Sequence, residues 1–220
     1  MQSAEKIKAI YKRLKSAYLH LPAPVKRMPK GNPWQVLVGA VLSTRTKDEV
    51  TVAAAKRLLK VAPNPQRLAG LKPEEVAREI YPVGFYQVKS KLLISLAGMI
   101  IKDYQGKVPK RKEELLRLPG VGRKVANIVL AQGFGVPAIA VDTHVHRISN
   151  RLGLVRTARP EMTEKYLHQI LPRRFWLNWN RFLVALGQTV CLPRFPKCGL
   201  CPIVKLCAKC GVRVARDGKG

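Results

Sequence analysis

The sequence predicts an all-α protein, and three observations lead to this prediction. Apolar residues recur at helical spacing along most of the 220 residues. Prolines and capping residues stand where helices should begin. No stretch shows a sustained alternation of apolar and polar residues, and the apolar run Val136–Val141 is isolated, so no sheet is expected.

The expected helices follow one another along the chain, about ten in all. Ile7, Ile10 and Leu14 share one face of an amphipathic first helix. Asn32 and Pro33 supply a cap and a first-turn proline for the second. The remaining helices are expected over 47–61, from Pro65, from Pro73, over 87–104, over 111–118, over 122–134, over 142–152, from Pro160 and over 175–190.

The charge of the chain indicates a polyanionic partner. Lys and Arg number 41 against 13 Asp and Glu, a net charge of +28, and hydrophobic residues make up 47%, so the chain is not a disordered basic tail. Acidic residues are absent from 6–47 and from 165–216. DNA is the favoured partner, ahead of RNA, and the alternative is a generally basic surface with no specific partner.

No apolar run reaches the roughly 18 residues of a membrane-spanning helix, so no membrane partner is expected. Charges throughout Met1–Lys15 exclude a signal peptide. We therefore expect an intracellular protein of prokaryotic type, in the cytoplasm or nucleoid, with reduced cysteines.

All five cysteines lie within twenty residues near the C-terminus, which is typical of a metal or iron–sulfur site. Spacing alone leaves two ligand sets open. Cys191, Cys198, Cys201 and Cys207 form one set. Cys198, Cys201, Cys207 and Cys210 form the other, and its two C-x2-C pairs are the more usual zinc pattern.

The segment Leu118–Lys124, Leu-Pro-Gly-Val-Gly-Arg-Lys, should join two helices by a tight turn. Gly120 and Gly122 permit positive φ and close backbone approach, and Val121 should anchor the turn inward. N–H groups at the start of the following helix form a phosphate site. An ordinary corner between helices is the alternative.

This turn, Val141-Asp142-Thr143-His144 and the spacing C-x6-C-x2-C-x5-C together resemble the endonuclease III family of helix–hairpin–helix DNA glycosylase/AP lyases, over residues 5–210. The resemblance implies a two-lobed helical DNA glycosylase fold. One lobe is a central domain, 27–137, with the hairpin; residues 1–26 and 138–220 form the second, with the iron–sulfur loop at 190–208. It also implies a catalytic cleft between the lobes, a [4Fe–4S] cluster on the first cysteine set, and a monomer.

Lys124 and Asp142 are the candidate catalytic residues. The helix dipole and the neighbouring Arg123 disfavour an ammonium at Lys124, which suits a Schiff-base nucleophile, whereas a phosphate contact is the alternative role. The resemblance implies the nucleophile. Asp142 should cap its helix, and the resemblance adds a catalytic carboxylate that stabilises positive charge on the sugar. Gly120, Val121, Gly122 and Arg123 are the expected DNA-binding residues of the hairpin.

Two positions depart from the family pattern. Arg45 stands where many members carry a glutamine that fills the space of the extruded nucleotide, and arginine can also fill space, stack and donate hydrogen bonds. Phe85 stands at the second wedge position, commonly leucine, and its ring can enter the helix gap. The alternative for Phe85 is a core residue on a loop.

The resemblance implies a base-excision repair enzyme that removes oxidised pyrimidines such as thymine glycol and cuts the strand 3′ to the abasic site. Its partner is duplex DNA with a damaged pyrimidine or an abasic site. Two other functions remain open at this point. One is a mismatch-specific thymine or uracil glycosylase of the same superfamily; the other is a non-enzymatic DNA-binding protein with structural zinc.

Overall fold

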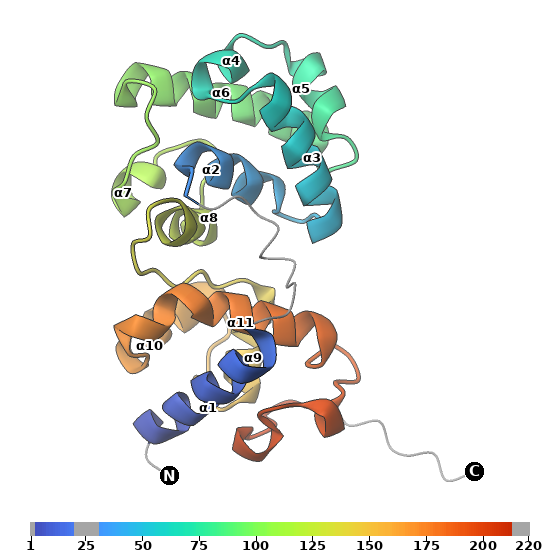
Figure 1. The fold of residues 1–220 in the computed structure, drawn as a ribbon, viewed down its shortest axis with the longest axis vertical. Coiled ribbons are helices and arrows are strands. Elements are labelled where there is room, and N and C mark those ends of the chain that lie inside the picture. The colour runs from blue at the N-terminus through green and yellow to red at the C-terminus, as the bar shows by residue number, and fades with distance from the viewer. Residues whose placement is uncertain (1–2, 20–30, 213–220) are drawn as a thin grey trace, which may run out of the picture. The chain divides into compact units, whose positions relative to one another are not determined.

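The computed structural model describes residues 3–19 and 31–212, and the regular structure of these ranges is helical, without a strand. The all-α prediction is confirmed. The chain divides into two compact units, a central unit, Lys26–Ala138, and a terminal unit, which joins Met1–Val25 to Ile139–Gly220 (Figure 1). The domain boundary expected between residues 26 and 27 lies outside the described residues.

The central unit is a small bundle of helices. Helix α6 packs against α4 and α5, and α2 packs against α3, α8 and a π-helical turn, η2 (Figure 1). Asn32 begins α2 as expected: its side chain accepts hydrogen bonds from the backbone N–H of Trp34 and Gln35. The helices of this unit are α2 (Pro33–Leu42), α3 (Asp48–Val61), α4 (Pro65–Ala69), α5 (Pro73–Ile80), α6 (Tyr86–Tyr104), α7 (Lys112–Leu115), α8 (Arg123–Ile128) and η2 (Val129–Gly133).

The region around the hairpin differs from the sequence prediction in two places. The helix expected over 111–118 is the single turn α7, and the one expected over 122–134 is α8 followed by η2. The wider turn ends at Gly133, where an added Cβ would stand 3.0 Å from the Pro33 Cα. A glycine at position 133 therefore allows α2 to pack closely on η2.

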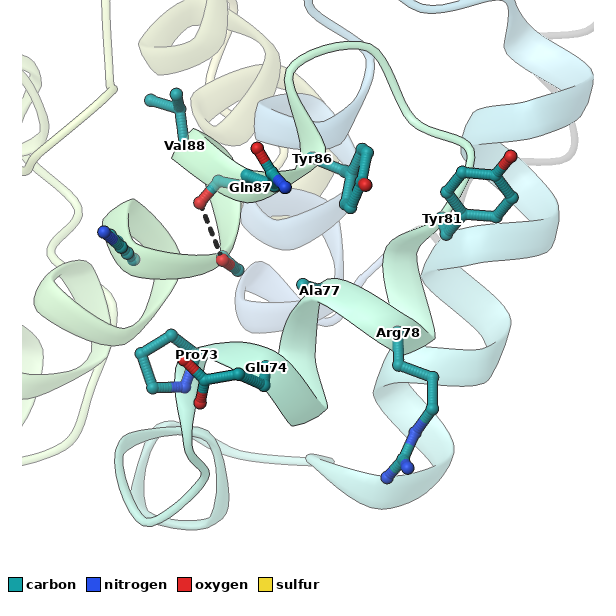
Figure 2. Close-up of a pocket in the computed structure, with 10 residues that line it drawn as sticks. Pro73, Glu74, Ala77, Arg78, Tyr81, Tyr86, Gln87 and Val88 are labelled. Atoms are coloured by element: carbon teal, nitrogen blue, oxygen red, sulfur yellow. Dashed lines mark hydrogen bonds between the residues drawn. The ribbon is translucent and has the colours of Figure 1, made fainter.

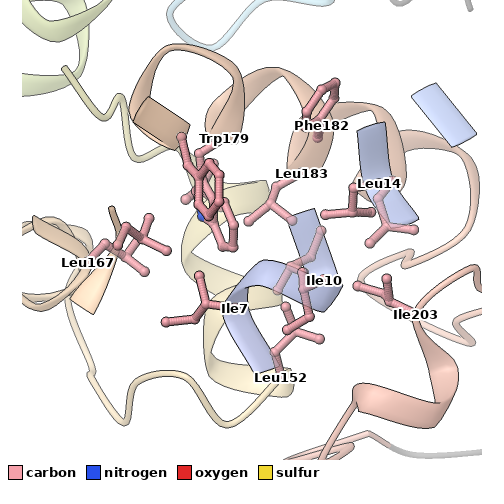
Figure 3. Packing of buried hydrophobic residues seen from close by; sticks show 14 of the residues in the cluster. Ile7, Ile10, Leu14, Leu152, Leu167, Trp179, Phe182, Leu183 and Ile203 are labelled. Carbon is pink, nitrogen blue, oxygen red and sulfur yellow. The ribbon is translucent and has the colours of Figure 1, made fainter. Parts of the chain in front are cut away.

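The terminal unit has one hydrophobic core, shown in Figure 3. Helix α1 supplies Ile7, Ile10 and Leu14, which are fully buried among side chains of α9, α10 and α11. Ile203, from the cysteine-rich segment near the C-terminus, is buried in the same core. That segment is thus part of the folded unit. The helices here are α1 (Ser3–Tyr18), α9 (Thr143–Arg151), α10 (Pro160–Ile170), η3 (Arg173–Phe175), α11 (Trp176–Thr189), η4 (Cys198–Leu200) and η5 (Val204–Leu206).

Within the part of the chain that the structure describes, none of the helices has the length and apolar character needed to cross a membrane.

Candidate functional site

The turn between α7 and α8 is anchored by its middle residues. Gly120 has a φ of 72°, a left-handed conformation, and an added Cβ there would meet the Leu92 side chain of α6. Val121 is only 5% exposed, as expected for an inward anchor. Gly122, which as a glycine could also adopt a positive φ, has a φ of −87°. This residue forms the N-cap of α8 with extended backbone, which any residue can adopt.

Gly122 differs from Gly120 in its surroundings as well as its backbone. It is exposed, and an added Cβ would meet no atom within 4 Å. Arg123, the next residue, is exposed at the first position of α8. The backbone of the turn is therefore open to approach from solvent on the side where α8 begins.

Lys124 lies in the first turn of α8, half-buried, and its Nζ donates a hydrogen bond of 3.0 Å to the Ser43 Oγ. Ser43 is the C-cap of α2, and its Oγ in turn donates to the Ala40 carbonyl oxygen at 2.8 Å. The hydrogen bond joins residues 81 positions apart in the sequence. It ties the candidate nucleophile to the segment that follows α2, residues 43–46, which we call the wedge loop because it contains Arg45.

The two candidate wedge residues lie close to each other. The guanidinium carbon of Arg45 is 5.6 Å from the centre of the Phe85 ring, within the range of a cation–π contact. Phe85 is 60% exposed, so its alternative role as a core residue is excluded. Both residues have a left-handed φ, 51° and 59°. Such conformations cost about 1–3 kcal/mol each for ordinary side chains and concentrate at functional sites.

Lys89 is a residue that the sequence analysis missed. It lies on α6, is only 6% exposed, and its Nζ donates to the carbonyl oxygens of Leu42 and Thr44 at 2.9 and 2.6 Å and to the Thr46 Oγ1 at 3.3 Å. Burial, and secondly the positive charge of Lys124, lowers the pKa of Lys89 to about 8. The sequence feature that could have indicated its burial is its position four residues before Leu93, on the buried face of α6.

Helix α5 and the first turns of α6 border an open hollow, drawn in Figure 2. Tyr81 and Tyr86 meet there edge to face, with ring centres 5.3 Å apart. The Ser90 hydroxyl donates to the Gln87 carbonyl oxygen at 2.8 Å. None of the site residues expected from the sequence lines this hollow, whose walls are Pro73, Glu74, Ala77, Arg78, Tyr81, Tyr86, Gln87, Val88, Ser90 and Lys91.

Asp142 belongs to the terminal unit and caps α9, as expected. Its Oδ1 accepts a 2.8 Å hydrogen bond from the backbone N–H of Val145. The side chain is half-buried, and only one of its carboxylate oxygens takes part in this cap. His146, one helical turn later, hydrogen-bonds through its Nδ1 to the Thr163 Oγ1, which agrees with a structural role.

Four cysteines line one hollow in the terminal unit: Cys191, Cys198, Cys201 and Cys207. Cys210 is exposed and does not line it. The hollow is otherwise bordered mainly by apolar side chains, apart from Arg151 and Lys209. These four sulfurs are the first of the two sets that the spacing allowed.

Protein donors also reach the cysteine sulfurs. The Arg151 Nη1 donates to the Cys191 Sγ at 3.3 Å, and the backbone N–H of Lys209 donates to the Cys207 Sγ at 3.3 Å. Burial raises the pKa of the Cys207 thiol, and it also raises the pKa of Cys201.

The chemistry of the donor set is compatible with an iron–sulfur cluster. A tetrahedral zinc site holds its sulfurs about 2.3 Å from one point. Among residues 3–19 and 31–212, no group of three or more His, Cys, Asp or Glu side chains converges closely enough to hold one metal ion. Four thiols around a common hollow, with protein N–H donors on the sulfurs of Cys191 and Cys207, suit an iron–sulfur cluster.

Comparison with known proteins agrees with these local features. Residues 38–173 match a family model described as HhH-GPD superfamily base excision DNA repair protein. Endonuclease III of Thermotoga maritima is 46% identical over 187 residues, covering 83% of this chain and 88% of that protein. Endonuclease III of Bacillus subtilis is 39% identical over 190 residues, covering 86% and 85%.

Solved structures give the same relationship. A trapped endonuclease III–DNA covalent intermediate superposes with a TM-score of 0.86 at 33% identity, covering 95% of this chain and 97% of that one. A thermostable thymine-DNA glycosylase has a TM-score of 0.82 at 24% identity, which indicates a shared fold. The matched family model spans more than half of the sequence, and the two relatives align with more than four fifths of it. The chain therefore belongs to the HhH-GPD superfamily of base excision DNA repair proteins and, within it, to the endonuclease III family.

Proposed function

We propose that this protein acts as a monomer on duplex DNA, removes oxidised pyrimidines such as thymine glycol through a Schiff base on Lys124, and then cuts the strand 3′ to the abasic site. As a member of the endonuclease III family it is a base-excision DNA glycosylase with AP lyase activity. The observation that carries the proposal is the position of Lys124, half-buried in the first turn of α8 and hydrogen-bonded to the wedge loop.

The amine of Lys124 is the proposed nucleophile. The damaged nucleotide leaves the duplex, because its C1′ is out of reach inside the stack. A bond forms between the lysine nitrogen and C1′, and the bond to the base breaks, with its electron pair and a proton leaving on the base. The nitrogen lone pair then forms a second bond to C1′ as the C1′–O4′ bond breaks, and O4′ takes up a proton, so that the opened sugar is joined to the lysine as a protonated imine. Removal of a C2′ proton then expels the 3′ phosphate, and water releases the enzyme.

The proposed role of Asp142 is to stabilise positive charge on the sugar as the base departs. One carboxylate oxygen caps α9, which fixes the side chain, while the other takes no part in that bond. Carboxylates serve the same purpose in glycoside hydrolysis. The capping role and the catalytic role are compatible.

The hairpin and the wedge residues are the proposed DNA contacts. Exposed Gly122 and Arg123 suit a phosphate at the start of α8, since no atom blocks access to the backbone there. Arg45 and Phe85 suit insertion into the gap left by the extruded nucleotide, because one is a long exposed cation and the other an exposed ring. The net charge of +28 adds attraction to any duplex.

Cys191, Cys198, Cys201 and Cys207 are the proposed ligands of a [4Fe–4S] cluster. When bound, such a cluster cross-links the loop from which its ligands come and so stabilises the fold. Ile203 packs into the core of the terminal unit, so the loop is continuous with the body of that unit. Arg194, Lys197 and Lys205 lie on this loop, where they are suited to contact the DNA backbone.

The other two functions are not favoured. A mismatch-specific thymine or uracil glycosylase without lyase activity needs no lysine at position 124. A non-enzymatic zinc-containing binding protein does not agree with membership of the endonuclease III family.

Borohydride trapping on a duplex with one thymine glycol tests the proposal. Reduction converts the imine into a stable protein–DNA adduct, which we expect from the natural protein and not from Lys124→Ala. Lys102→Ala is a matched control, because Lys102 is exposed at the far end of α6. Duplex affinity should stay similar in all three proteins. Absence of an adduct from the natural protein, despite tight binding, would contradict the lyase mechanism.

A further inference from the structure

We infer that Lys89 is a positioning residue for excision: its buried ammonium ties the wedge loop to α6 and so fixes both Ser43, the hydroxyl partner of Lys124, and Arg45. The inference rests on the proposed function, because it assigns Lys89 an effect on the chemistry of Lys124. Lys89 itself contacts neither the nucleophile nor, as proposed, the DNA.

The ammonium of Lys89 uses all of its hydrogen-bonding capacity inside the protein. It has three N–H donors, and its three acceptors all belong to residues 42–46, the last residue of α2 and the wedge loop. At 6% exposure, little water is available to replace any of them. A buried charge with this set of partners holds the segment in one arrangement, since releasing any acceptor would leave a buried donor unsatisfied.

Thr46 doubles the attachment. Its Oγ1 accepts hydrogen bonds from the Lys89 Nζ at 3.3 Å and from the Gly84 backbone N–H at 3.1 Å. The same hydroxyl donates a hydrogen bond to the Thr44 carbonyl oxygen at 3.1 Å. Gly84 precedes Phe85, and an added Cβ on Gly84 would stand 2.5 Å from the Arg45 carbonyl oxygen. The two segments that carry the candidate wedge residues therefore touch backbone to backbone and are hydrogen-bonded through one threonine.

The same attachment reaches the nucleophile. The wedge loop begins with Ser43, whose Oγ receives the hydrogen bond from Lys124. Thr44 and Leu42, its two neighbours in the chain, are both held by Lys89 through their carbonyl oxygens. Movement of either neighbour would displace the hydroxyl that orients the Lys124 amine. Displacements of about 1 Å in such positioning groups can lower a rate by about a hundredfold.

A lysine at this place also has a plain stabilising effect. The Leu42 carbonyl ends α2, and a cation beside the carbonyl end of a helix is favourable. Loss of stability alone would therefore not distinguish positioning from helix capping. The test must separate the rate of the chemical step from binding and from folding.

The main experiment compares Lys89→Met with Lys102→Met, the matched loss of one charge on the same helix. Enzyme in excess is mixed with the thymine glycol duplex, and the borohydride-trapped adduct is followed in time to give a maximal rate. We expect Lys89→Met to lower that rate at least about tenfold, with undamaged-duplex affinity within about twofold. Lys102→Met should match the natural protein. A folded Lys89→Met protein with the natural maximal rate would overturn the inference.

Thr46→Val is a second variant that leaves Lys89 in place. It removes the oxygen that accepts hydrogen bonds from Gly84 and Lys89 while keeping the shape of the side chain. If Lys89→Met does not fold, this variant tests the positioning role instead. We expect the same separation, a slower chemical step with unchanged affinity for undamaged duplex. If folded Thr46→Val reacts at the rate of the natural protein, the attachment of the wedge loop through Thr46 does not control the chemical step.

Ser43→Ala completes a double-mutant cycle with Lys89→Met. If Lys89 acts through Ser43, the double variant should lose no more of the rate than Lys89→Met alone, whereas additive losses would overturn this route. Failure of the proposed function gives a different pattern. A natural protein without a Lys124-dependent adduct would overturn both proposals, whereas a normal adduct with Lys89→Met equal to the natural protein would overturn only the inference about Lys89.

Discussion

The hollow lined by cysteines and the hydrogen-bonded group around Lys124 are assembled in different ways. The four thiols of the terminal unit come from a single stretch of seventeen positions, Cys191 to Cys207. The group in the central unit joins α2, the wedge loop, α6 and α8, and its Lys124–Ser43 bond spans 81 positions. One site depends on local spacing and on the proposed cofactor, and the other depends on packing between distant segments. Substitutions should therefore affect the two in different ways.

The largest expected effect is loss of the cofactor from the terminal unit. Cys191→Ser should abolish the broad visible absorbance and reduce iron from about four atoms per chain to near zero, because one thiolate ligand is lost. The thermal unfolding transition should fall as well, since cluster binding contributes to folding. Iron analysis and absorbance spectra measure the first effect, and calorimetry the second.

Cys210→Ser is the matched control for that experiment, because Cys210 is exposed and outside the hollow. It should keep natural iron content and absorbance. Iron loss in Cys210→Ser with retention in Cys191→Ser would reverse the assignment of the ligand set and favour the alternative one.

Asp142 allows its structural and chemical roles to be separated. Asp142→Asn keeps an oxygen that can accept from the Val145 N–H but removes the charge. We expect the rate of adduct formation to fall about a hundredfold or more, with thermal stability nearly unchanged. Asp142→Ala should lose about 1 kcal/mol of stability in addition, through the missing cap. Equal rates in Asp142→Asn and the natural protein would limit Asp142 to capping.

The two glycines of the hairpin should respond oppositely to alanine. Gly120→Ala forces a side chain into a left-handed conformation and against Leu92, with an expected cost of about 3–4 kcal/mol in the free energy of unfolding. Gly122→Ala should change stability by less than about 0.5 kcal/mol, since its φ is ordinary and its surroundings are open. It should instead weaken duplex binding, because the new methyl group would stand at the proposed phosphate contact. Denaturant unfolding and duplex titration of both variants measure the difference.

Features set by a few neighbouring residues could be predicted from the sequence. The Asn32 cap of α2, the Asp142 cap of α9 and the inward Val121 depend on chemistry within four or five positions. The cysteine spacing belongs to the same class, although by itself it leaves two ligand sets open, and the exclusion of Cys210 from the hollow supports the proposed one.

Features set by distant packing could not be predicted in this way. An added Cβ on Gly120 would meet Leu92 of α6, and one on Gly133 would meet Pro33 at the start of α2, so both contacts join segments that are far apart in the sequence. Lys89 is the clearest case, because nothing near it in the sequence supplies its three acceptors, which lie 43 to 47 positions away. A lysine on the helix face that carries Leu93, Leu96 and Ile100 indicates a buried cation, but not its partners.

The pH dependence of stability provides a final and smaller test of the Lys89 site. Folding lowers the pKa of Lys89 from 10.5 to about 8, through burial first and the charge of Lys124 second. Between these values the unfolded chain still holds a proton that the folded chain has released, so the free energy of unfolding should rise with pH, by up to about 3 kcal/mol in total. Below pH 8 both states are protonated and Lys89 adds no slope.

Lys89→Met should remove this contribution, whereas Lys102→Met should keep it. Urea unfolding of the three proteins at pH 7.5, 9 and 10 measures the difference between their slopes, which cancels the titration of other groups. A slope that is the same in all three would mean that the folded protein holds the Lys89 proton as firmly as water does. In that case the hydrogen bonds from Lys89 to Leu42 and to the wedge loop would offset the full cost of burying the ammonium.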